Sequence, residues 1–172
     1  MMKSIRKDAF GFFKSEDVYN ALKRERGFEV VKDDMRRTNG DITLPTRSDN
    51  RSAGYDFYAP TNYKCEPHKI TKIWTDVKAY MLSDEVLLLD VRSSQGGKFR
   101  LANTIGVVDS SYYENENNDG NLCLLLENTT DETIVIKKGD RIGQGLFMKY
   151  LITDDDAPLS DERKGGFGST GK

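Results

Sequence analysis

From about residue 41 onward the sequence breaks into short apolar runs separated by turn residues, and this pattern constrains the fold more than any other feature. Between Ile73 and Leu82, two sets of side chains alternate with the period of a half-buried β-strand. Further short apolar runs lie at residues 86–89, 122–126, 133–136 and 142–151. Many short strands with almost no helical periodicity are typical of a barrel or jelly-roll sandwich. We therefore predict an all-β domain, a jelly-roll-like β-barrel, over residues 28–151.

The two ends of the chain differ from this central part. Residues 1–27 are predicted to form an arm in which a short helix begins after Ser15 and stops at Gly27. The apolar stripe of this helix is narrow, so the helix either packs on something larger or belongs to a solvated arm. Residues 152–172 are polar and rich in glycine, and they are predicted to form a mobile tail.

Charge and residue usage exclude several classes of protein. The formal net charge is −2, which provides no positive field to hold a nucleic-acid polymer or an anionic membrane. The longest apolar run, Leu122–Leu126, is far too short to span a membrane, and residues 1–17 show no secretory signal. Cys65, Cys123 and His68 suit no disulfide framework, zinc finger or Ser–His–Asp triad. We expect a soluble protein of the cytoplasm, or of the host cytoplasm if the chain comes from a phage.

The tail carries the first candidate binding segment. Four of the 15 glycines lie in the last eight residues, where Gly166–Gly171 reads Gly-Phe-Gly-Ser-Thr-Gly. Glycine N–H groups and the neighbouring hydroxyls can surround an oxyanion, and Phe167 offers an aromatic face to a base. The spacing is not that of a Walker loop. The alternative is a flexible linker.

Three further segments carry side chains suited to phosphate binding or to acid–base chemistry. Arg92–Ser94 follows an apolar run and offers a guanidinium and two hydroxyls to a phosphate, although a polar hairpin loop has the same composition. In the second segment, Asp109 follows two valines that would partly desolvate a general base, and Tyr112 could stack on a sugar. The alternative is an aspartate that shapes a hairpin. The third segment, Lys138–Gln144, is otherwise a turn with a surface ion pair.

Taken in order, these segments resemble the trimeric dUTPase family. The resemblance extends over residues 44–171 and includes all five family motifs. These motifs correspond to Ala53–Ala59, Arg92–Ser94, Asn103–Tyr112, Gly139–Gln144 and Gly165–Gly171. The resemblance implies a β-rich subunit and a homotrimer whose active sites combine residues of three subunits. It also implies hydrolysis of dUTP to dUMP and pyrophosphate with Mg²⁺.

The resemblance also implies roles for individual residues. Asp109 would orient and deprotonate the water that attacks the α-phosphorus. Asn103 and Gly106 would read the uracil edge, and Tyr112 would pack beneath the deoxyribose and reject UTP. Asp56 would reach Mg²⁺ only through water, since the metal sits mainly on triphosphate oxygens. The side chains expected to hold phosphates from a neighbouring subunit are those of Arg92, Ser93, Ser94 and Gln144.

The tail would close over the bound nucleotide as a lid. Phe167 would cover the uracil, and Arg163 would lie near the γ-phosphate. Here Arg163 stands four residues before Phe167, whereas many family members have five. Gly168, Ser169 and Thr170 would contact the phosphates.

Two departures from the family pattern leave other functions open. Residues 113–120 insert a longer acidic loop after Tyr112, which is either solvated or binds a regulatory protein partner. Glu127 stands where the related dCTP deaminases carry a catalytic glutamate, so a deaminase or a bifunctional enzyme is the alternative to a diphosphatase. The tail argues against a pure deaminase.

Overall fold

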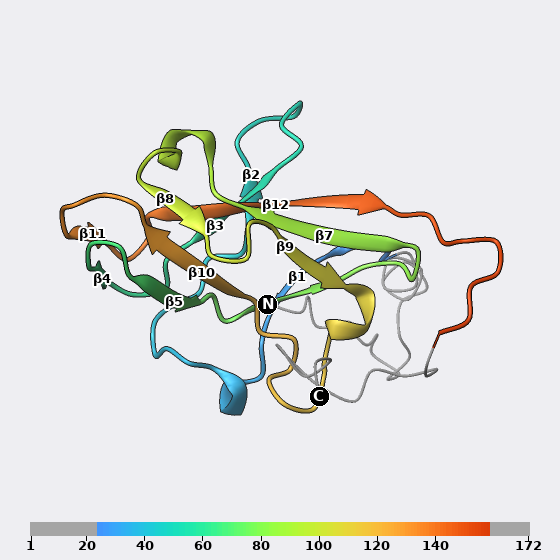
Figure 1. Cartoon of the computed structure of the whole chain (residues 1–172). Helices are drawn as coiled ribbons and strands as arrows, with labels where there is room; N and C mark the ends of the chain where they lie inside the picture. Colours follow the sequence, from blue (N-terminus) through green and yellow to red (C-terminus); the bar gives the residue numbers. More distant parts are fainter. Residues whose placement is uncertain (1–23, 159–172) are drawn as a thin grey trace, which may run out of the picture.

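Short antiparallel strands build the part of the chain that the structure describes, residues 24–158 of the computed structural model (Figure 1). The strands are β1 (Gly27–Val30), β2 (Thr46–Arg47), β3 (Tyr55–Tyr58), β4 (Tyr63–Cys65), β5 (Ile70–Trp74), β6 (Val77–Tyr80), β7 (Glu85–Asp90), β8 (Phe99–Leu101), β9 (Gly106–Asp109), β10 (Cys123–Asn128), β11 (Ile134–Ile136) and β12 (Arg141–Lys149). The 3-10 helices are η1 (Asp33–Met35), η2 (Ser93–Gln95) and η3 (Ser110–Tyr112). The predicted all-β fold is confirmed.

The strands form one five-stranded sheet and three smaller ones. The large sheet has the order β2-β3-β12-β7-β9, and a three-stranded sheet has the order β5-β10-β8. The pairs β1-β6 and β11-β4 complete the structure. Since β8 pairs with β10 and β9 pairs with β7, the β8–β9 connection links the two larger sheets.

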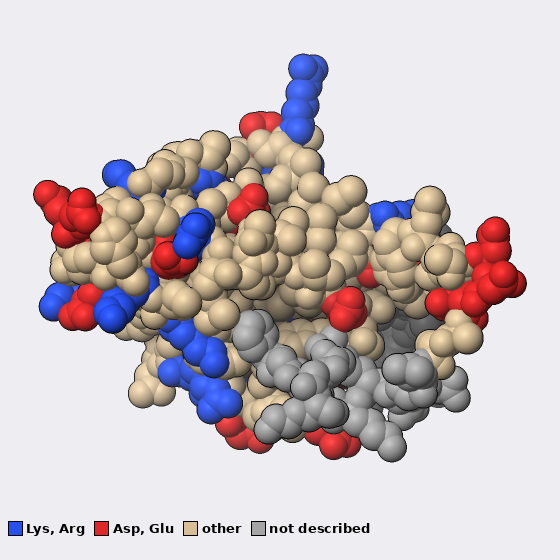
Figure 2. Space-filling model, in the orientation of Figure 1, with Lys and Arg blue, Asp and Glu red and all other residues tan. Residues whose placement is uncertain are grey.

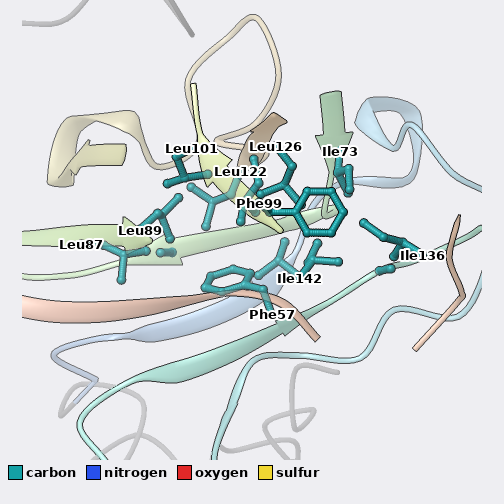
Figure 3. Packing of buried hydrophobic residues seen from close by; sticks show 14 of the residues in the cluster. Phe57, Ile73, Leu87, Leu89, Phe99, Leu101, Leu122, Leu126, Ile136 and Ile142 are labelled. Carbon is teal, nitrogen blue, oxygen red and sulfur yellow. The ribbon is translucent and has the colours of Figure 1, made fainter. Parts of the chain in front are cut away.

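The core lies between the two larger sheets (Figure 3). In β7 the alternation of the sequence places Leu87 and Leu89 in the core and Val86 and Leu88 on the opposite face. Buried side chains of the large sheet therefore face buried side chains of β5, β8 and β10. The labelled members of the core are Phe57, Ile73, Leu87, Leu89, Phe99, Leu101, Leu122, Leu126, Ile136 and Ile142.

The alternating run from Ile73 to Leu82 does lie mostly on strands, but it is interrupted by a turn that the alternation does not indicate. The run divides into β5 and β6 because Asp76 adopts a left-handed conformation with a φ of 54°. The buried Asp76 carboxylate accepts hydrogen bonds from the backbone N–H groups of Arg37 and Thr38, at 2.8 and 2.9 Å. The turn therefore anchors the segment that follows β1.

The ends of the described range bear on the predicted arm. Residues 24–26, the end of the helix predicted after Ser15, are not helical, and the rest of that helix lies outside the described residues. Strand β1 already begins at Gly27. No helix within residues 24–158 is long and apolar enough to cross a membrane. On the face that Figure 2 shows, basic and acidic side chains are interspersed over a largely uncharged surface.

Candidate active site

A row of polar side chains crosses the large sheet on the face opposite the core. Gln144 of β12 lies directly between Asp56 of β3 and Asp90 of β7 in the strand register. Because Phe57 and Leu89, the neighbours of these two aspartates, point into the core, the row points away from it. Side chains of three strands thus meet at one place on the outer surface.

Two arginines converge on Asp56 at one end of this row. Arg92 Nε lies 2.8 Å from Asp56 Oδ1, and Arg141 Nη1 lies 3.2 Å from Asp56 Oδ2. The Asp56 carboxylate is buried, and Ser48 Oγ also donates to it at 3.3 Å. Each guanidinium has five N–H donors, so these contacts orient the arginines and still permit them to bind phosphate oxygens. We call Asp56, Arg92, Ser94, Arg141 and Gln144 the Asp56 cluster.

The Gln144 amide is fixed by its surroundings. Its Nε2 donates to the carbonyl of Val91 at 3.4 Å. A Cβ on Gly54 would lie 2.7 Å from Gln144 Oε1, so a glycine at this position is what leaves room for the amide. Gln95 Nε2 donates to the Arg141 carbonyl at 2.8 Å and ties η2 to β12. A cavity of about 290 Å³ opens beside the Asp56 cluster, with Lys98 in its lining.

The second candidate region is the β8–β9 connection. Asn103 is exposed at its tip, where Thr104 has a φ of 66° and Ile105 N donates to Asn103 O at 2.7 Å. Gly106 packs close to β7, because a Cβ there would lie 3.0 Å from Leu89 Cβ. Asp109 ends β9 opposite Val86, on the same outer face as the Asp56 cluster.

The structure corrects the expected surroundings of Asp109. The carboxylate is on an exposed residue, and Val107, expected to desolvate it, is itself 60% exposed. The two valines therefore do not provide a dry environment within one chain. Any desolvation of Asp109 has to come from what covers this face.

Tyr112 lies deeper than the sequence suggests. Its side chain belongs to the core, and only 6% of the residue surface is exposed. The hydroxyl donates to the Asn121 carbonyl at 3.0 Å and accepts from Asn118 Nδ2 at 2.6 Å. The tyrosine is thus a fixed wall with a small exposed part rather than an open platform.

Asp109 and the Asp56 cluster are far apart within one chain. In the register, Asp109 pairs with Val86 and Gln144 pairs with Asp90, and β9 and β12 flank β7 on opposite sides. Four residues along the strand and two strand spacings across give a separation of roughly 16 Å. One chain therefore does not bring the Asp109 carboxylate to the Asp56 cluster.

Comparison with known proteins decides the family. The dUTPase family profile matches residues 40–171. The chain is 45% identical over 149 residues to a deoxyuridine 5'-triphosphate nucleotidohydrolase of Lactococcus lactis, covering 85% of this chain and 97% of that protein. The chain belongs to the dUTPase family.

Further relatives agree with this assignment. The Mus musculus deoxyuridine 5'-triphosphate nucleotidohydrolase is 32% identical over 164 residues, covering 92% of this chain and 98% of that protein. The crystal structure of a dUTPase from Streptococcus mutans superimposes with a TM-score of 0.66 at 38% identity, covering 74% of this chain and 98% of that one.

The dUTPase resemblance placed further candidate residues in the tail and on β10. Arg163, Phe167, Gly168, Ser169 and Thr170 lie outside the described residues. On β10, both oxygens of Glu127 accept from Arg100 at 2.9 Å, and these hydrogen bonds lower the pKa of Glu127. Glu127 belongs to the three-stranded sheet, whereas Asp109 belongs to the large one.

The described residues limit how the expected metal could bind. Within residues 24–158, no group of three or more His, Cys, Asp or Glu side chains could hold a metal ion. Asp56, the only predicted metal contact, already pairs with two arginines through both of its oxygens. Such a site would suit an Mg²⁺ ion held mainly by triphosphate oxygens, and the contact of Asp56 through water stays a prediction.

Three residues of the candidate site are not evident from the sequence alone. The sequence indicates only a turn at Arg141, a motif position at Gly54 and a loop at Asn118, whereas the structure places Arg141 on Asp56, Gly54 against Gln144 and Asn118 on Tyr112. Arg141 directly follows the Gly-Asp turn of the fourth motif, which is a signal that could have found it. The contact of Gly54 with Gln144 arises only when β3 and β12 pair. Asn118 contacts residues at most six positions away, but nothing in the sequence shows that the loop folds back onto Tyr112.

Proposed function

We propose that this dUTPase-family chain hydrolyses Mg²⁺-bound dUTP to dUMP and pyrophosphate. The observation that carries the proposal is the Asp56 cluster, in which Asp56 holds Arg92 and Arg141 beside the Gln144 amide. Two guanidiniums, a hydroxyl and an amide at one place are the donors that a triphosphate needs. Family membership then supplies the identity of the nucleotide.

The active site is proposed to form between subunits of a homotrimer. The separation of about 16 Å between Asp109 and Gln144 supports this arrangement, since the attacking water and the bound phosphates have to meet. The outer face of the large sheet also carries apolar side chains on three strands. These are Val86 and Leu88 of β7, Val107 of β9, and Leu146 and Met148 of β12. Such a patch is typical of a surface that a partner covers.

The chemical step is attack of a water molecule at the α-phosphorus, assisted by removal of a proton from that water. Asp109 accepts the proton as the water oxygen bonds to phosphorus, and the bond from that phosphorus to the bridging oxygen breaks to release pyrophosphate. A positioned general base contributes roughly 10²–10⁴-fold to such a step. Mg²⁺ held by the triphosphate would supply positive charge against the charge that develops on the phosphate oxygens, and Asp56 would reach it only through water. Arg92, Ser93, Ser94 and Gln144 orient the triphosphate.

Nucleotide selection is proposed to involve the β8–β9 connection and the tail. Asn103 and the backbone near Gly106 read the uracil edge, and the exposed part of Tyr112 lies beneath the deoxyribose. The tail closes over the site and excludes water, which strengthens each polar contact. In this closed state Phe167 covers the uracil. Arg163, Gly168, Ser169 and Thr170 contact the phosphates.

The alternatives find less support in the described residues. A proton shuttle for dCTP deamination needs a pKa near the working pH, whereas the bidentate pairing with Arg100 lowers the pKa of Glu127. The inserted loop, the candidate surface for a regulatory protein, buries Asn118 and Asp119. We therefore place the diphosphatase first.

One assay separates these functions. The purified chain is incubated with dUTP or with dCTP in the presence of Mg²⁺, and pyrophosphate and ammonia are both measured. We expect pyrophosphate from dUTP and no ammonia from dCTP. Absence of pyrophosphate from dUTP would contradict the proposal, and ammonia from dCTP would favour the deaminase.

A further inference from the structure

The loop inserted after Tyr112 is built into the body of the protein. Asn118 and Asp119 are buried, and Asp119 Oδ2 lies 3.0 Å from the buried ammonium of Lys78. The backbone N–H of Lys32 donates to the same oxygen at 2.8 Å. The solvated alternative is therefore wrong for Asn118 and Asp119, whereas Glu114, Glu116 and Asn117 of the same loop are exposed.

Asn118 is the residue of this loop that reaches the Tyr112 hydroxyl. Its Oδ1 accepts from Asn115 Nδ2 at 2.6 Å and from the Gly120 N–H at 3.1 Å. Because two donors surround this oxygen, the amide is oriented with Nδ2 toward the tyrosine, and Nδ2 donates to Tyr112 Oη at 2.6 Å. The neighbouring side chains thus determine which way the amide points.

The acceptor of the Tyr112 hydroxyl is fixed as well. That acceptor is the carbonyl of Asn121, whose side chain is completely buried. Asn121 Nδ2 donates to Asp76 Oδ1 at 2.8 Å, and Asp76 N donates back to Asn121 Oδ1 at 3.0 Å. The hydroxyl end of Tyr112 is therefore held from two sides, by Asn118 and by Asn121.

A wall that excludes one hydroxyl group has to be rigid. A pocket that yields discriminates weakly between two ligands that differ by a single small group. If the tyrosine ring could move away, a 2'-hydroxyl would be accommodated. We infer that Asn118 is a positioning residue that holds Tyr112 against the sugar and thereby sets the preference for dUTP over UTP. This inference rests on the proposed function, in which Tyr112 lies beneath the deoxyribose.

The experiment measures kcat/KM for dUTP and for UTP in four variants. Asn118→Ala is expected to lower the dUTP/UTP ratio about five- to tenfold, the value of one buried neutral hydrogen bond. Asn117→Ala, an exposed neighbour in the same loop, is the matched control and should leave the ratio unchanged. Tyr112→Phe removes the hydroxyl, so adding Asn118→Ala to it should cause no further change.

Each outcome decides the inference. An unchanged ratio in active Asn118→Ala overturns it, as does an equal fall of the ratio in the Tyr112→Phe background. If thermal melting shows that Asn118→Ala does not fold, Tyr112→Phe carries the test, because it keeps the ring, and an unchanged ratio there overturns the inference. Absence of dUTP hydrolysis by the wild-type chain would instead contradict the proposed function.

Discussion

The ion pair beneath the inserted loop allows a quantitative prediction for Lys78→Met. The Lys78 side chain is 5% exposed and that of Asp119 is 1% exposed, and their charged atoms lie 3.0 Å apart. Removing one partner of a buried pair typically costs about 3–5 kcal/mol. Asp119 keeps the Lys32 N–H, so we expect the lower end, about 3 kcal/mol, or a fall in Tm of roughly 6–12 °C for a chain of this size.

A thermal melt at pH 7 with two matched variants checks this value. Glu114 also pairs with Lys78 at 3.0 Å, but its side chain is 50% exposed. Glu114→Gln should therefore cost no more than about 1 kcal/mol. Lys78→Met combined with Asp119→Asn should recover most of the loss, because no buried charge is left unpaired. The reasoning is refuted if Lys78→Met is no less stable than Glu114→Gln.

The same pair predicts how the effect depends on pH. Burial alone would raise the pKa of Asp119, but hydrogen bonds from the Lys32 N–H and the Lys78 ammonium lower it below its ordinary value of 3.8. A carboxylate with a lowered pKa stabilises the fold above the unfolded value, and this contribution is lost as pH falls through the folded one. The stability gap between wild type and Lys78→Met should therefore narrow below about pH 4.

Three further predictions concern catalysis. Asp109→Asn should abolish pyrophosphate release while nucleotide binding persists, as measured by calorimetry; turnover like that of the wild type would remove the general base from the account. Gly54→Ala should raise KM for dUTP about five- to tenfold with little change in Tm, because the new Cβ displaces the Gln144 amide; an unchanged KM would mean that Gln144 does not contact substrate. Deleting residues 163–172 should cripple hydrolysis and leave a trimer on light scattering, whereas a monomer would show that these residues build the assembly.

The strand content was predictable because the apolar pattern is local. The runs at residues 86–89, 122–126 and 133–136 all lie on strands within two residues of their expected ends. The turn at Asp76 was missed because its cause is distant. The carboxylate is buried only when Thr38 and Asn121, 38 and 45 residues away, supply its hydrogen bonds.

The site was predictable as residues but not as an arrangement. Motif order identified Arg92 and Asp56, yet assigned them to a phosphate and to a metal separately. The structure shows that they form one ion pair, because β3 and β7 both flank β12. The inserted loop was misread for a similar reason, since the polar residues near Asn118 suggest solvent until Tyr112 and Lys78 are found beside them.

The central claim is that one active site combines Asp109 of one subunit with the Asp56 cluster of another. Co-expression of two inactive variants, Asp109→Asn and Arg92→Ala, tests it most directly, because mixed trimers then contain some sites with both residues intact. With equal amounts and random assembly, about a quarter of the sites should be complete, so dUTP hydrolysis should return to about a quarter of the wild-type rate. If each site belonged to a single chain, no site would be complete, and mixed trimers without activity would contradict the account.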